Sequence, residues 1–398
     1  MSAAAKRELR IGIVGAGAMA GAHSTALANV PLLYPDLPLR PRLVAVADVN
    51  PKLATALVDR YHWERVEANA AAIIGAADVD LVVVCLPPAF NRDVVLAAAA
   101  AGKHVVCEKP LAPTAEEAAV MLRACQAAGV FHGLGAGYRW SPSVRAIGRL
   151  IRDGELGTIR SIRVSFMLDY AADPAVPLVW RFNKRLAGGG LGIDTGYHLI
   201  DLARFLVGEI ESIQAVSHVF IAQRPLPSAD AVGNRGDGGG TGVREMGPVD
   251  AEDAAAALLT FAGGAYGVLE TSRVAIGRRV SLQVEVYGSK GSADWDLERP
   301  DEFHVSLAGD ESDRVRRALE NPGYSGGRQL VVSGPDGPGL GWLGQQCAMW
   351  AEFLSAIGEG RPGSADFTDG VRDSAVLDAL YAAAESGNRT AVVLPDGI

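Results

Sequence analysis

The chain has few of the features that mark secreted, membrane-spanning or nucleic-acid-binding proteins. Its four cysteines show no Cys-x-x-Cys spacing, and three fall in apolar or helical runs where a reduced thiol packs as a small hydrophobe. The longest apolar run, Val94 to Ala101, is too short to cross a bilayer, and the first residues contain no signal-like apolar core. Acids outnumber bases by 46 to 37, and no basic cluster appears. We therefore expect a cytoplasmic protein with no membrane span and no nucleic-acid partner.

Length and patterning predict two domains of different architecture. At 398 residues the chain is longer than one core usually supports. Between Arg10 and Val130, short apolar runs alternate with alanine-rich helical stretches, which is typical of β-α-β units and a doubly wound parallel sheet. We expect an α/β domain at residues 1–130 and a second domain at 131–398, whose C-terminal helical region packs back on the first.

The second domain is expected to be α+β, with a large, open, mostly antiparallel sheet and helices on one face. Its predicted strands are Ile159 to Leu168, Ile210 to Phe220, Ala254 to Phe261, Ala265 to Arg273 and Val280 to Tyr287. Two glycine-rich polar segments, 228–247 and 323–344, are too long for simple turns. They are interpreted as binding loops or mobile covers, with disorder as the alternative.

A glycine-rich turn follows the first predicted strand. The sequence GAGAMAG begins at Gly15, directly after the apolar run IGIV and before a helical stretch. Gly15 allows a tight bend, Gly17 lets the backbone approach a pyrophosphate at the helix N-terminus, and Ala20 takes a third position where alanine is tolerated. Because the strand-turn-helix context fits, we predict a dinucleotide site at Gly15, Gly17, Ala18 and Met19.

Asp48 predicts which dinucleotide is bound. It ends the second apolar strand, where a carboxylate accepts hydrogen bonds from the adenosine ribose and repels a 2′-phosphate. Asp48 comes later after the turn than is usual, and the proline-rich segment 31–41 accounts for the excess. The pattern favours NAD over NADP, and a turn-capping aspartate is the alternative.

Two further sets of residues have side chains suited to hydride transfer from an alcohol. A strand runs into Glu108-Lys109-Pro, and ligands of parallel sheets lie at such carboxyl ends. In the second domain Asp194 and His198 are four residues apart and would share one face of a helix. Histidine suits removal of a hydroxyl proton, and the Lys109 ammonium would stabilise the developing alkoxide. An N-capping Asp194 with a core His198 is the alternative.

Together these residues resemble the family of glucose-fructose oxidoreductase, inositol dehydrogenase and MocA, over nearly the whole chain. The resemblance includes Tyr287-Gly-Ser-Lys-Gly and the closing region 366–387. It implies a Rossmann domain followed by an open sheet whose face often forms the oligomer contact, hence a homodimer or homotetramer. It also implies a sugar or cyclitol substrate held between the domains and a catalytic set of Lys109, Asp194 and His198.

Within the family, the segment 171–184 is similar to levoglucosan dehydrogenase and related sugar 3-dehydrogenases, which oxidise a pyranose-ring hydroxyl to a ketone. By that resemblance Tyr138, Arg139, Trp180 and Arg181 form the sugar wall beside the catalytic residues. An aromatic face packs on ring C–H groups, and a guanidinium donates to hydroxyls. Ordinary domain packing is the alternative.

One loop departs from the family pattern. After the third predicted strand the chain has PPAFN where the family commonly has Pro-Asn-His-x-His. The cofactor contacts are nevertheless predicted to include Leu86, Pro87 and Asn91, together with Glu108 and Lys109.

The resulting hypothesis is a hydride-transfer mechanism without a metal, since the His and Cys residues show no ligand spacing. His198 accepts the hydroxyl proton, Lys109 polarises the same oxygen, and Asp194 orients the histidine or binds a neighbouring hydroxyl. His23, in the first helix, is expected to pack. The substrate alternatives are an inositol, an aminosugar or a ketosugar reduced in secondary metabolism. A nonenzymatic NAD-sensing regulator is the remote alternative, since a sensor has no need of all three groups.

Overall fold

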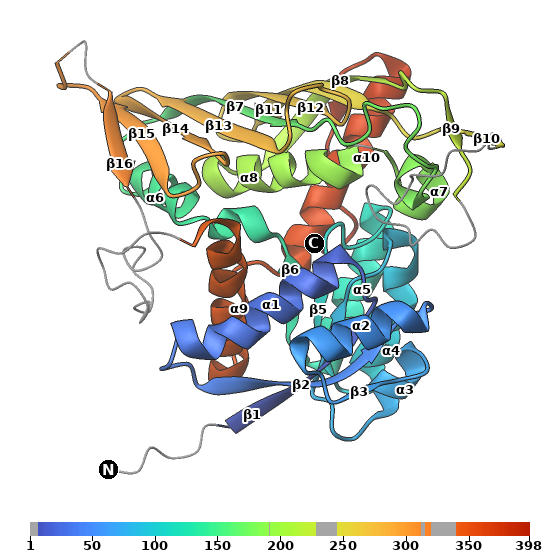
Figure 1. Cartoon of the computed structure of the whole chain (residues 1–398). Helices are drawn as coiled ribbons and strands as arrows, with labels where there is room; N and C mark the ends of the chain where they lie inside the picture. The colour runs from blue at the N-terminus through green and yellow to red at the C-terminus, as the bar shows by residue number, and fades with distance from the viewer. Residues whose placement is uncertain (1–6, 191, 228–244, 312–314, 320–339) are drawn as a thin grey trace.

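The computed structural model describes residues 7–190, 192–227, 245–311, 315–319 and 340–398, and these form two sheets with their helices (Figure 1). The two glycine-rich segments lie mostly outside the described residues. Within them, residues 245–247 run into β10 (Met246–Pro248), and residues 340–344 begin α9 (Gly341–Glu359). Their role as binding loops stays a prediction.

The N-terminal sheet confirms the predicted doubly wound architecture. Its strand order is β3-β2-β1-β4-β5-β6, and every pairing is parallel. The order reverses between β1 and β4, and ligands of such sheets bind beside the carboxyl ends of the strands at that point. The strands are β1 (Arg7–Val14), β2 (Leu39–Ala47), β3 (Arg65–Val66), β4 (Leu81–Val84), β5 (His104–Glu108) and β6 (His132–Gly135).

The inner strands of this sheet consist of continuous apolar runs. All four residues of β4 are fully buried leucine and valines, because helices cover both faces of a parallel sheet. The helices are α1 (Ala18–Leu33), α2 (Pro51–Tyr61), α3 (Ala70–Gly75), α4 (Asn91–Ala100) and α5 (Ala115–Ala128). Strand β6 belongs to this sheet and ends at Gly135, so the sheet extends a few residues past position 130, and the exact domain boundary stays a prediction.

The C-terminal sheet has the order β16-β15-β14-β13-β7-β12-β11-β8-β17, in which only the β7–β12 pair is parallel. The predicted mostly antiparallel open sheet is therefore confirmed. Its strands are β7 (Ile159–Met167), β8 (Ile210–His218), β11 (Ala254–Phe261), β12 (Tyr266–Ser272), β13 (Ser281–Gly288), β14 (Gly291–Asp296), β15 (Glu302–Leu307), β16 (Arg316–Leu319) and β17 (Thr390–Ala391). A short ribbon pairs β9 (Gln223–Pro225) with β10.

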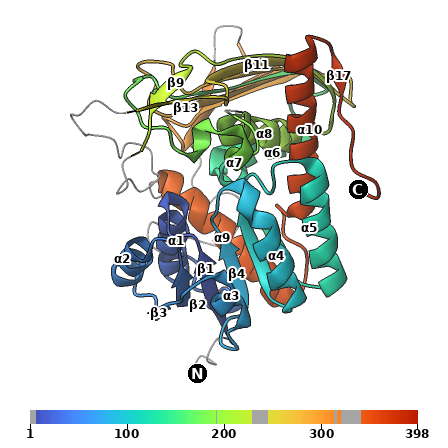
Figure 2. The same ribbon diagram turned by 90° about the vertical axis from the view of Figure 1, so that its right-hand side faces the viewer.

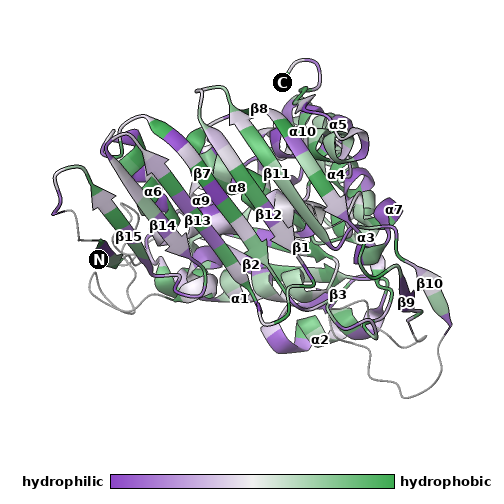
Figure 3. Cartoon of the chain, turned by 90° about the horizontal axis from the view of Figure 1, so that it is seen from above, coloured by the Kyte–Doolittle hydropathy of each residue, from purple (hydrophilic) through white to green (hydrophobic). Residues whose placement is uncertain are grey.

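Helices cover one face of this sheet and leave the other uncovered (Figures 1 and 3). Residues of β11 alternate accordingly: Leu259 and Phe261 are buried, whereas Leu258 is 56% exposed. The remaining helices are α6 (Pro142–Arg152), α7 (Lys184–Ala187), α8 (Tyr197–Val207) and α10 (Phe367–Ser386), with short 3-10 turns η1 (Pro88–Phe90), η2 (Gly137–Trp140) and η3 (Trp180–Phe182).

The last two long helices join the domains. Helix α9 packs on α1, where Trp350 Nε1 donates to His23 Nδ1 at 2.9 Å. Helix α10 lies beside α5, and Asp378 Oδ2 accepts the backbone N–H of Ala115 at 2.9 Å (Figure 2). Both contacts give polar groups a partner, and they hold the two domains together. Within the described residues, no helix is long and apolar enough to cross a membrane.

Candidate active site

The glycine-rich turn presents an open helix N-terminus. Gly15 has φ +93°, and a Cβ there would lie 2.4 Å from the backbone oxygen of Cys85, so the turn requires glycine. Gly17 is the N-cap of α1, where no side chain caps the first turn. A Cβ on Gly17 would meet no atom within 4 Å. The start of α1 therefore has no capping side chain and has open space beside Gly17, as an anion site requires, with Ala18 and Met19 in the first turn.

Asp48 braces this turn from the end of β2. Its Oδ2 accepts the N–H of Ala16 and its Oδ1 accepts the N–H of Asn50, each at 2.7 Å. The capping role considered as an alternative is therefore present. The side chain is also partly exposed, so contact with a ribose stays a prediction.

One of the three residues after β4 that were predicted at the cofactor has its side chain bound to the protein instead. Asn91 was predicted at the cofactor, but it is 1% exposed and its Nδ2 donates to the backbone oxygens of Pro110 and Leu111 at 3.2 and 3.1 Å. We therefore correct its assignment: Asn91 braces the chain directly after Lys109. Leu86 and Pro87 stay partly exposed, and Leu86 lies beside Gly15.

Glu108 is held by a buried hydrogen-bonded chain. Its Oε1 lies 2.8 Å from His23 Nε2, and His23 is fully buried. The indole N–H of Trp350 can only donate, so His23 Nδ1 accepts from it and His23 Nε2 carries the proton toward Glu108. This arrangement gives His23 the packing role expected for it. Glu108 is 5% exposed, so any contact with the cofactor is made from a fixed orientation.

Lys109 of the N-terminal domain contacts Asp194 of the C-terminal domain. It follows β5 directly, and its Nζ donates to the backbone oxygen of Asp194 at 2.5 Å. Asp194 lies in a π-helical turn, η4 (Gly192–Gly196), and His198 lies in the first turn of α8. The sequence predicted one regular helix through both residues. Instead, a π-helical turn, which holds one residue more than a regular α-helical turn, precedes α8. Such turns are common at functional sites.

Three glycines, two before η4 and one at its first residue, are required by close packing. A Cβ on Gly189 or Gly192 would lie 2.4 or 2.7 Å from the Tyr381 hydroxyl oxygen, and a Cβ on Gly190 would lie 2.0 Å from Glu252 Oε2. Hydrogen bonds fix the same backbone, because Tyr381 accepts the Gly190 N–H and Glu252 accepts the Gly192 N–H, each at 3.0 Å. Gly189, Gly190 and Gly192 thus position the turn that carries Asp194.

Aromatic and polar side chains surround Asp194 and His198. The Tyr138 ring packs edge-to-face on His198, with centroids 4.7 Å apart, and Phe166 lies 6.1 Å from the same imidazole. The Tyr170 hydroxyl donates to Asp194 Oδ2 at 2.8 Å. Sequence motifs did not single out Tyr170, because it stands in an irregular stretch with no periodic signal.

Arg181 reaches the same carboxylate from η3, and the Trp180 ring lies beside its guanidinium. Arg181 Nε lies 3.6 Å from Asp194 Oδ1, and the Arg181 guanidinium lies 4.2 Å from the centroid of the Trp180 ring. Both residues are partly exposed. Arg181 Nε has no hydrogen-bond partner within the described residues. An amphipathic wall with a donor group therefore stands beside Asp194.

Arg139 does not belong to this wall. It is 4% exposed, and its guanidinium is paired with Asp201 on α8 and with Asp369 on α10, the latter at 2.8 Å. The prediction that Arg139 binds substrate is corrected on this geometry, because both ends of its fork are already occupied. Its role is to join η2 to the helices under the C-terminal sheet.

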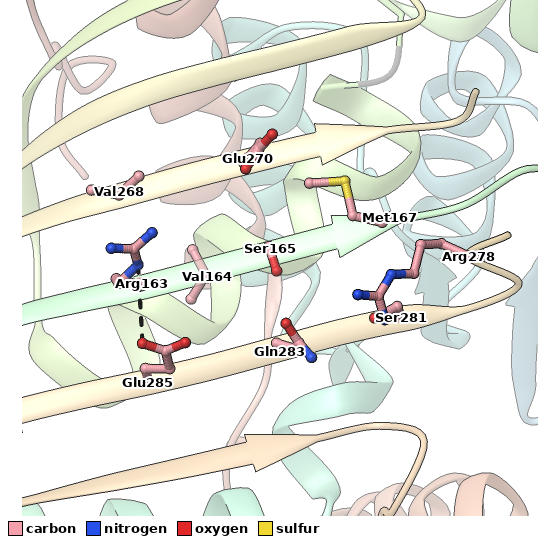
Figure 4. Close-up of a pocket in the computed structure, with 10 residues that line it drawn as sticks. All are labelled: Arg163, Val164, Ser165, Met167, Val268, Glu270, Arg278, Ser281, Gln283 and Glu285. Atoms are coloured by element: carbon pink, nitrogen blue, oxygen red, sulfur yellow. Dashed lines mark ion pairs between the residues drawn. The ribbon is translucent and has the colours of Figure 1, made fainter. Parts of the chain in front are cut away.

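A hollow of about 260 Å³ on the uncovered face of the C-terminal sheet lies apart from this site. It lies on β7, β12 and β13, and Arg163 and Glu285 form an ion pair across two of these strands at 4.0 Å (Figure 4). No predicted site residue lines it. Among the described residues, no group of three His, Cys, Asp or Glu side chains could hold a metal ion.

Fold and site together define a two-domain, NAD(P)-dependent oxidoreductase. Residues 9–136 match the model of an oxidoreductase family with an NAD-binding Rossmann fold, and residues 144–294 match the GFO/IDH/MocA C-terminal domain. The chain belongs to the Gfo/Idh/MocA oxidoreductase family, which confirms the resemblance inferred from its motifs.

Relatives in this family act on sugars and cyclitols. Levoglucosan dehydrogenase of Pseudarthrobacter phenanthrenivorans is 36% identical over 382 residues, which span 95% of this chain and 96% of the relative. Inositol 2-dehydrogenase of Rhizobium meliloti is 30% identical over 299 residues, 75% and 78% of the two chains.

Solved structures agree with this comparison. The apo form of levoglucosan dehydrogenase matches with a TM-score of 0.90 and 34% identity, over 98% of this chain and 100% of that chain. Its complex with NADH and levoglucosan matches with a TM-score of 0.88 and 33% identity, over 97% and 100%.

Proposed function

We propose that this protein oxidises a ring hydroxyl of a levoglucosan-like or glucoside-like sugar to a ketone, with NAD as the hydride acceptor. The observation that carries the proposal is the 2.5 Å hydrogen bond from Lys109 Nζ to the Asp194 backbone oxygen, which joins an ammonium of one domain to the η4–α8 segment of the other, where Asp194 and His198 lie. The 36% identity with levoglucosan dehydrogenase supports the substrate class.

The N-terminal domain fits the cofactor. The uncapped start of α1 and the open space over Gly17 would receive the pyrophosphate, and Asp48 would meet the adenosine ribose. The Asp48 carboxylate supports NAD over NADP, because a 2′-phosphate would bring like charge next to it. When bound, the nicotinamide supplies the acceptor for the hydride.

The chemical roles follow from the groups around Asp194. His198 Nδ1 or Nε2 takes the proton of the sugar hydroxyl as the C–H bond breaks. Lys109 Nζ stabilises the negative charge that develops on that oxygen. Asp194, whose carboxylate oxygens face Tyr170 and Arg181, orients the sugar through a neighbouring hydroxyl.

The first test compares two lysines at opposite ends of β5. Lys109→Ala removes the ammonium at the carboxyl end, and we expect loss of NADH formation with unchanged NAD affinity. Lys103→Ala is the matched control, since Lys103 Nζ also donates to backbone oxygens, those of Ala76 and Val79, at the far end of the strand. Near-wild-type turnover by the Lys109 variant would refute the assignment.

Inositol is the second candidate substrate, supported by the 30% identity with inositol 2-dehydrogenase. NADH absorbance with a panel of levoglucosan, glucose, glucosides and myo-inositol separates the two. Turnover of inositol alone would assign a cyclitol dehydrogenase. If none of these compounds yields NADH, the result would favour a biosynthetic ketosugar reductase or a nonenzymatic regulator.

A homo-oligomer is part of the proposal. The uncovered sheet face carries exposed Val216, Leu258 and Tyr266, at 63%, 56% and 59% exposure. Arg163 and Glu285 on the same face would suit a symmetric copy, because each sign can meet its opposite (Figure 4). Light scattering of the wild type and of Leu258→Glu tests this, with a lower mass expected for the variant.

A reducing compartment is supported by four free cysteines.

A further inference from the structure

The segment from Tyr170 to Phe182, which contains Trp180 and Arg181 of the proposed sugar wall, meets Asp194 at both of its ends. Near one end the Tyr170 hydroxyl donates to Asp194 Oδ2 at 2.8 Å. Near the other, Arg181 Nε lies 3.6 Å from Asp194 Oδ1. The orientation of this carboxylate therefore depends on how the segment itself is held.

Two arginines outside the candidate site pin the segment's backbone. The Ala171 N–H donates to the Arg273 backbone oxygen at 3.0 Å, and Arg273 Nη1 donates to the Arg181 backbone oxygen at 3.0 Å. Arg224 Nη2 donates to the Ala171 oxygen at 2.5 Å, and its Nη1 donates to the Asp173 oxygen at 3.0 Å. Arg273 therefore holds the segment near both ends, at the Ala171 N–H next to Tyr170 and at the backbone oxygen of Arg181.

The Phe182 ring is the point where both arginines converge. The Arg224 and Arg273 guanidinium carbons lie 4.2 and 4.4 Å from its centroid. All three side chains are fully buried. Cation–π contact in a desolvated position adds to the hydrogen bonds, so the ring and the two planar groups form one rigid unit.

The guanidinium groups of Arg224 and Arg273 have different hydrogen-bond partners. Arg273 Nε pairs with the fully buried Asp253 at 2.9 Å. Arg224 has backbone oxygens as its hydrogen-bond acceptors in the described part of the chain, and its Nε has no partner. Burying a cation without a carboxylate partner destabilises a fold, and an apolar side chain would fill the space at lower cost. What Arg224 supplies here is the geometry of its fork, which donates to the backbone oxygens of Ala171 and Asp173 at once.

We propose that Arg224 and Arg273, acting on Phe182 and on the backbone of residues 170–182, are positioning residues that set sugar affinity. They hold Tyr170 and Arg181 against the two oxygens of Asp194, and they do so without touching sugar or cofactor. The inference rests on the proposed function, because it takes Asp194 and Arg181 as sugar-binding groups.

Steady-state kinetics of R224K and F182L test the proposal. Lysine keeps the charge but loses the planar fork, and leucine keeps an apolar side chain but loses the ring face. We expect the sugar KM to rise about tenfold in each variant, with kcat within about threefold and NAD affinity unchanged, because ground-state positioning is lost. R273K is a poorer choice, since it also removes the partner of buried Asp253 and endangers folding.

F261L is the matched control. Phe261 is a buried phenylalanine at the far end of β11, so F261L makes the same change in side-chain volume away from the segment. An unchanged KM in F261L supports the proposal. An unchanged KM in both R224K and F182L, or an equal rise in F261L, overturns it by showing a structural role only.

Hydrogen exchange tests the clamp independently of any substrate. The amides of Ala171, Leu178 and Phe182 are hydrogen-bonded, so the peptide 168–184 is expected to exchange slowly in the wild type. It should exchange faster in R224K and not in F261L, while peptides of the N-terminal sheet stay unchanged. No selective change would overturn the clamp. If the wild type oxidises no sugar, the proposed function fails, whereas selective exchange in R224K still supports the clamp.

Discussion

The Tyr170 hydroxyl donates to Asp194 Oδ2 at 2.8 Å, from an irregular segment that no sequence motif marks. Hydrogen bonds to a charged group contribute about 1.5–3 kcal/mol. Tyr170→Phe should therefore lower kcat/KM for the sugar at least about tenfold. Circular dichroism should be unchanged. Tyr266→Phe, on the uncovered sheet face, is the control and should behave as wild type. Equal activity of the two variants would remove Tyr170 from the site.

Asp48→Asn should relax the choice of nucleotide. The amide oxygen can still accept the Ala16 N–H while the bond from the Asn50 N–H is lost, so the variant keeps one of the two turn hydrogen bonds and removes the negative charge. We expect the ratio of kcat/KM for NADP to that for NAD to rise about tenfold, which corresponds to about 1.4 kcal/mol. Asp59→Asn, an exposed change of the same charge on α2, should leave the ratio unaltered. An unaltered ratio in the Asp48 variant would leave Asp48 with its capping role alone.

The sequence predicted the fold well because both sheets have a strong periodic signal. Buried runs such as Leu81–Val84 and alternating strands such as Ala254–Phe261 each fit one type of strand. Turn chemistry likewise located Gly15 and Gly17, whose backbone geometry the structure explains.

Side-chain partners were harder to predict, because they depend on contacts between distant segments. The guanidinium of Arg139 and the amide of Asn91 have the chemistry of ligand-binding groups, yet both are occupied by protein partners 62 and 19 residues away. The π turn at Asp194 was missed for a related reason: it depends on Tyr381 and Glu252, which pack against glycines far from them in sequence.

Gly190→Ala should disable the turn that carries Asp194. The new Cβ would lie 2.0 Å from Glu252 Oε2, so Glu252 or the turn must shift. We expect activity to fall about a hundredfold and the unfolding free energy to fall by about 1–3 kcal/mol, the range for overpacking. Gly263→Ala is the control, because its Cβ would meet nothing within 4 Å. Activity assays and urea unfolding of both variants measure the difference.

His23→Phe should destabilise the joint between α1, β5 and α9. It leaves the Glu108 carboxylate and the Trp350 N–H buried without partners. Each buried polar group left without a partner lowers the unfolding free energy by about 1–3 kcal/mol. His23→Gln can still donate and accept, and should recover part of the loss. Urea unfolding measures both, and a phenylalanine variant as stable as wild type would contradict the hydrogen-bonded chain.

Asp373 gives the protein a predictable pH dependence of stability. It is fully buried, Arg204 Nη1 donates to its Oδ1 at 2.5 Å, and its Oδ2 has no partner in the described structure. Burial raises the pKa of Asp373 to about 8, against the attraction of Arg204. The same cause raises the pKa of neighbouring Asp201. The folded state therefore holds a proton between pH 4 and 8 that the unfolded chain has released.

The sign follows from this difference in bound protons. Because the folded state binds more protons, the unfolding free energy falls as pH rises across this window, by at most about 1.4 kcal/mol per pH unit for one group. Asp373→Asn keeps an acceptor for Arg204 and carries no charge to bury. Its unfolding free energy should match wild type near pH 4 and exceed it at pH 8, as measured by urea unfolding at both pH values. A variant less stable than wild type at pH 8 would mean that Asp373 is ionised there and balances Arg204.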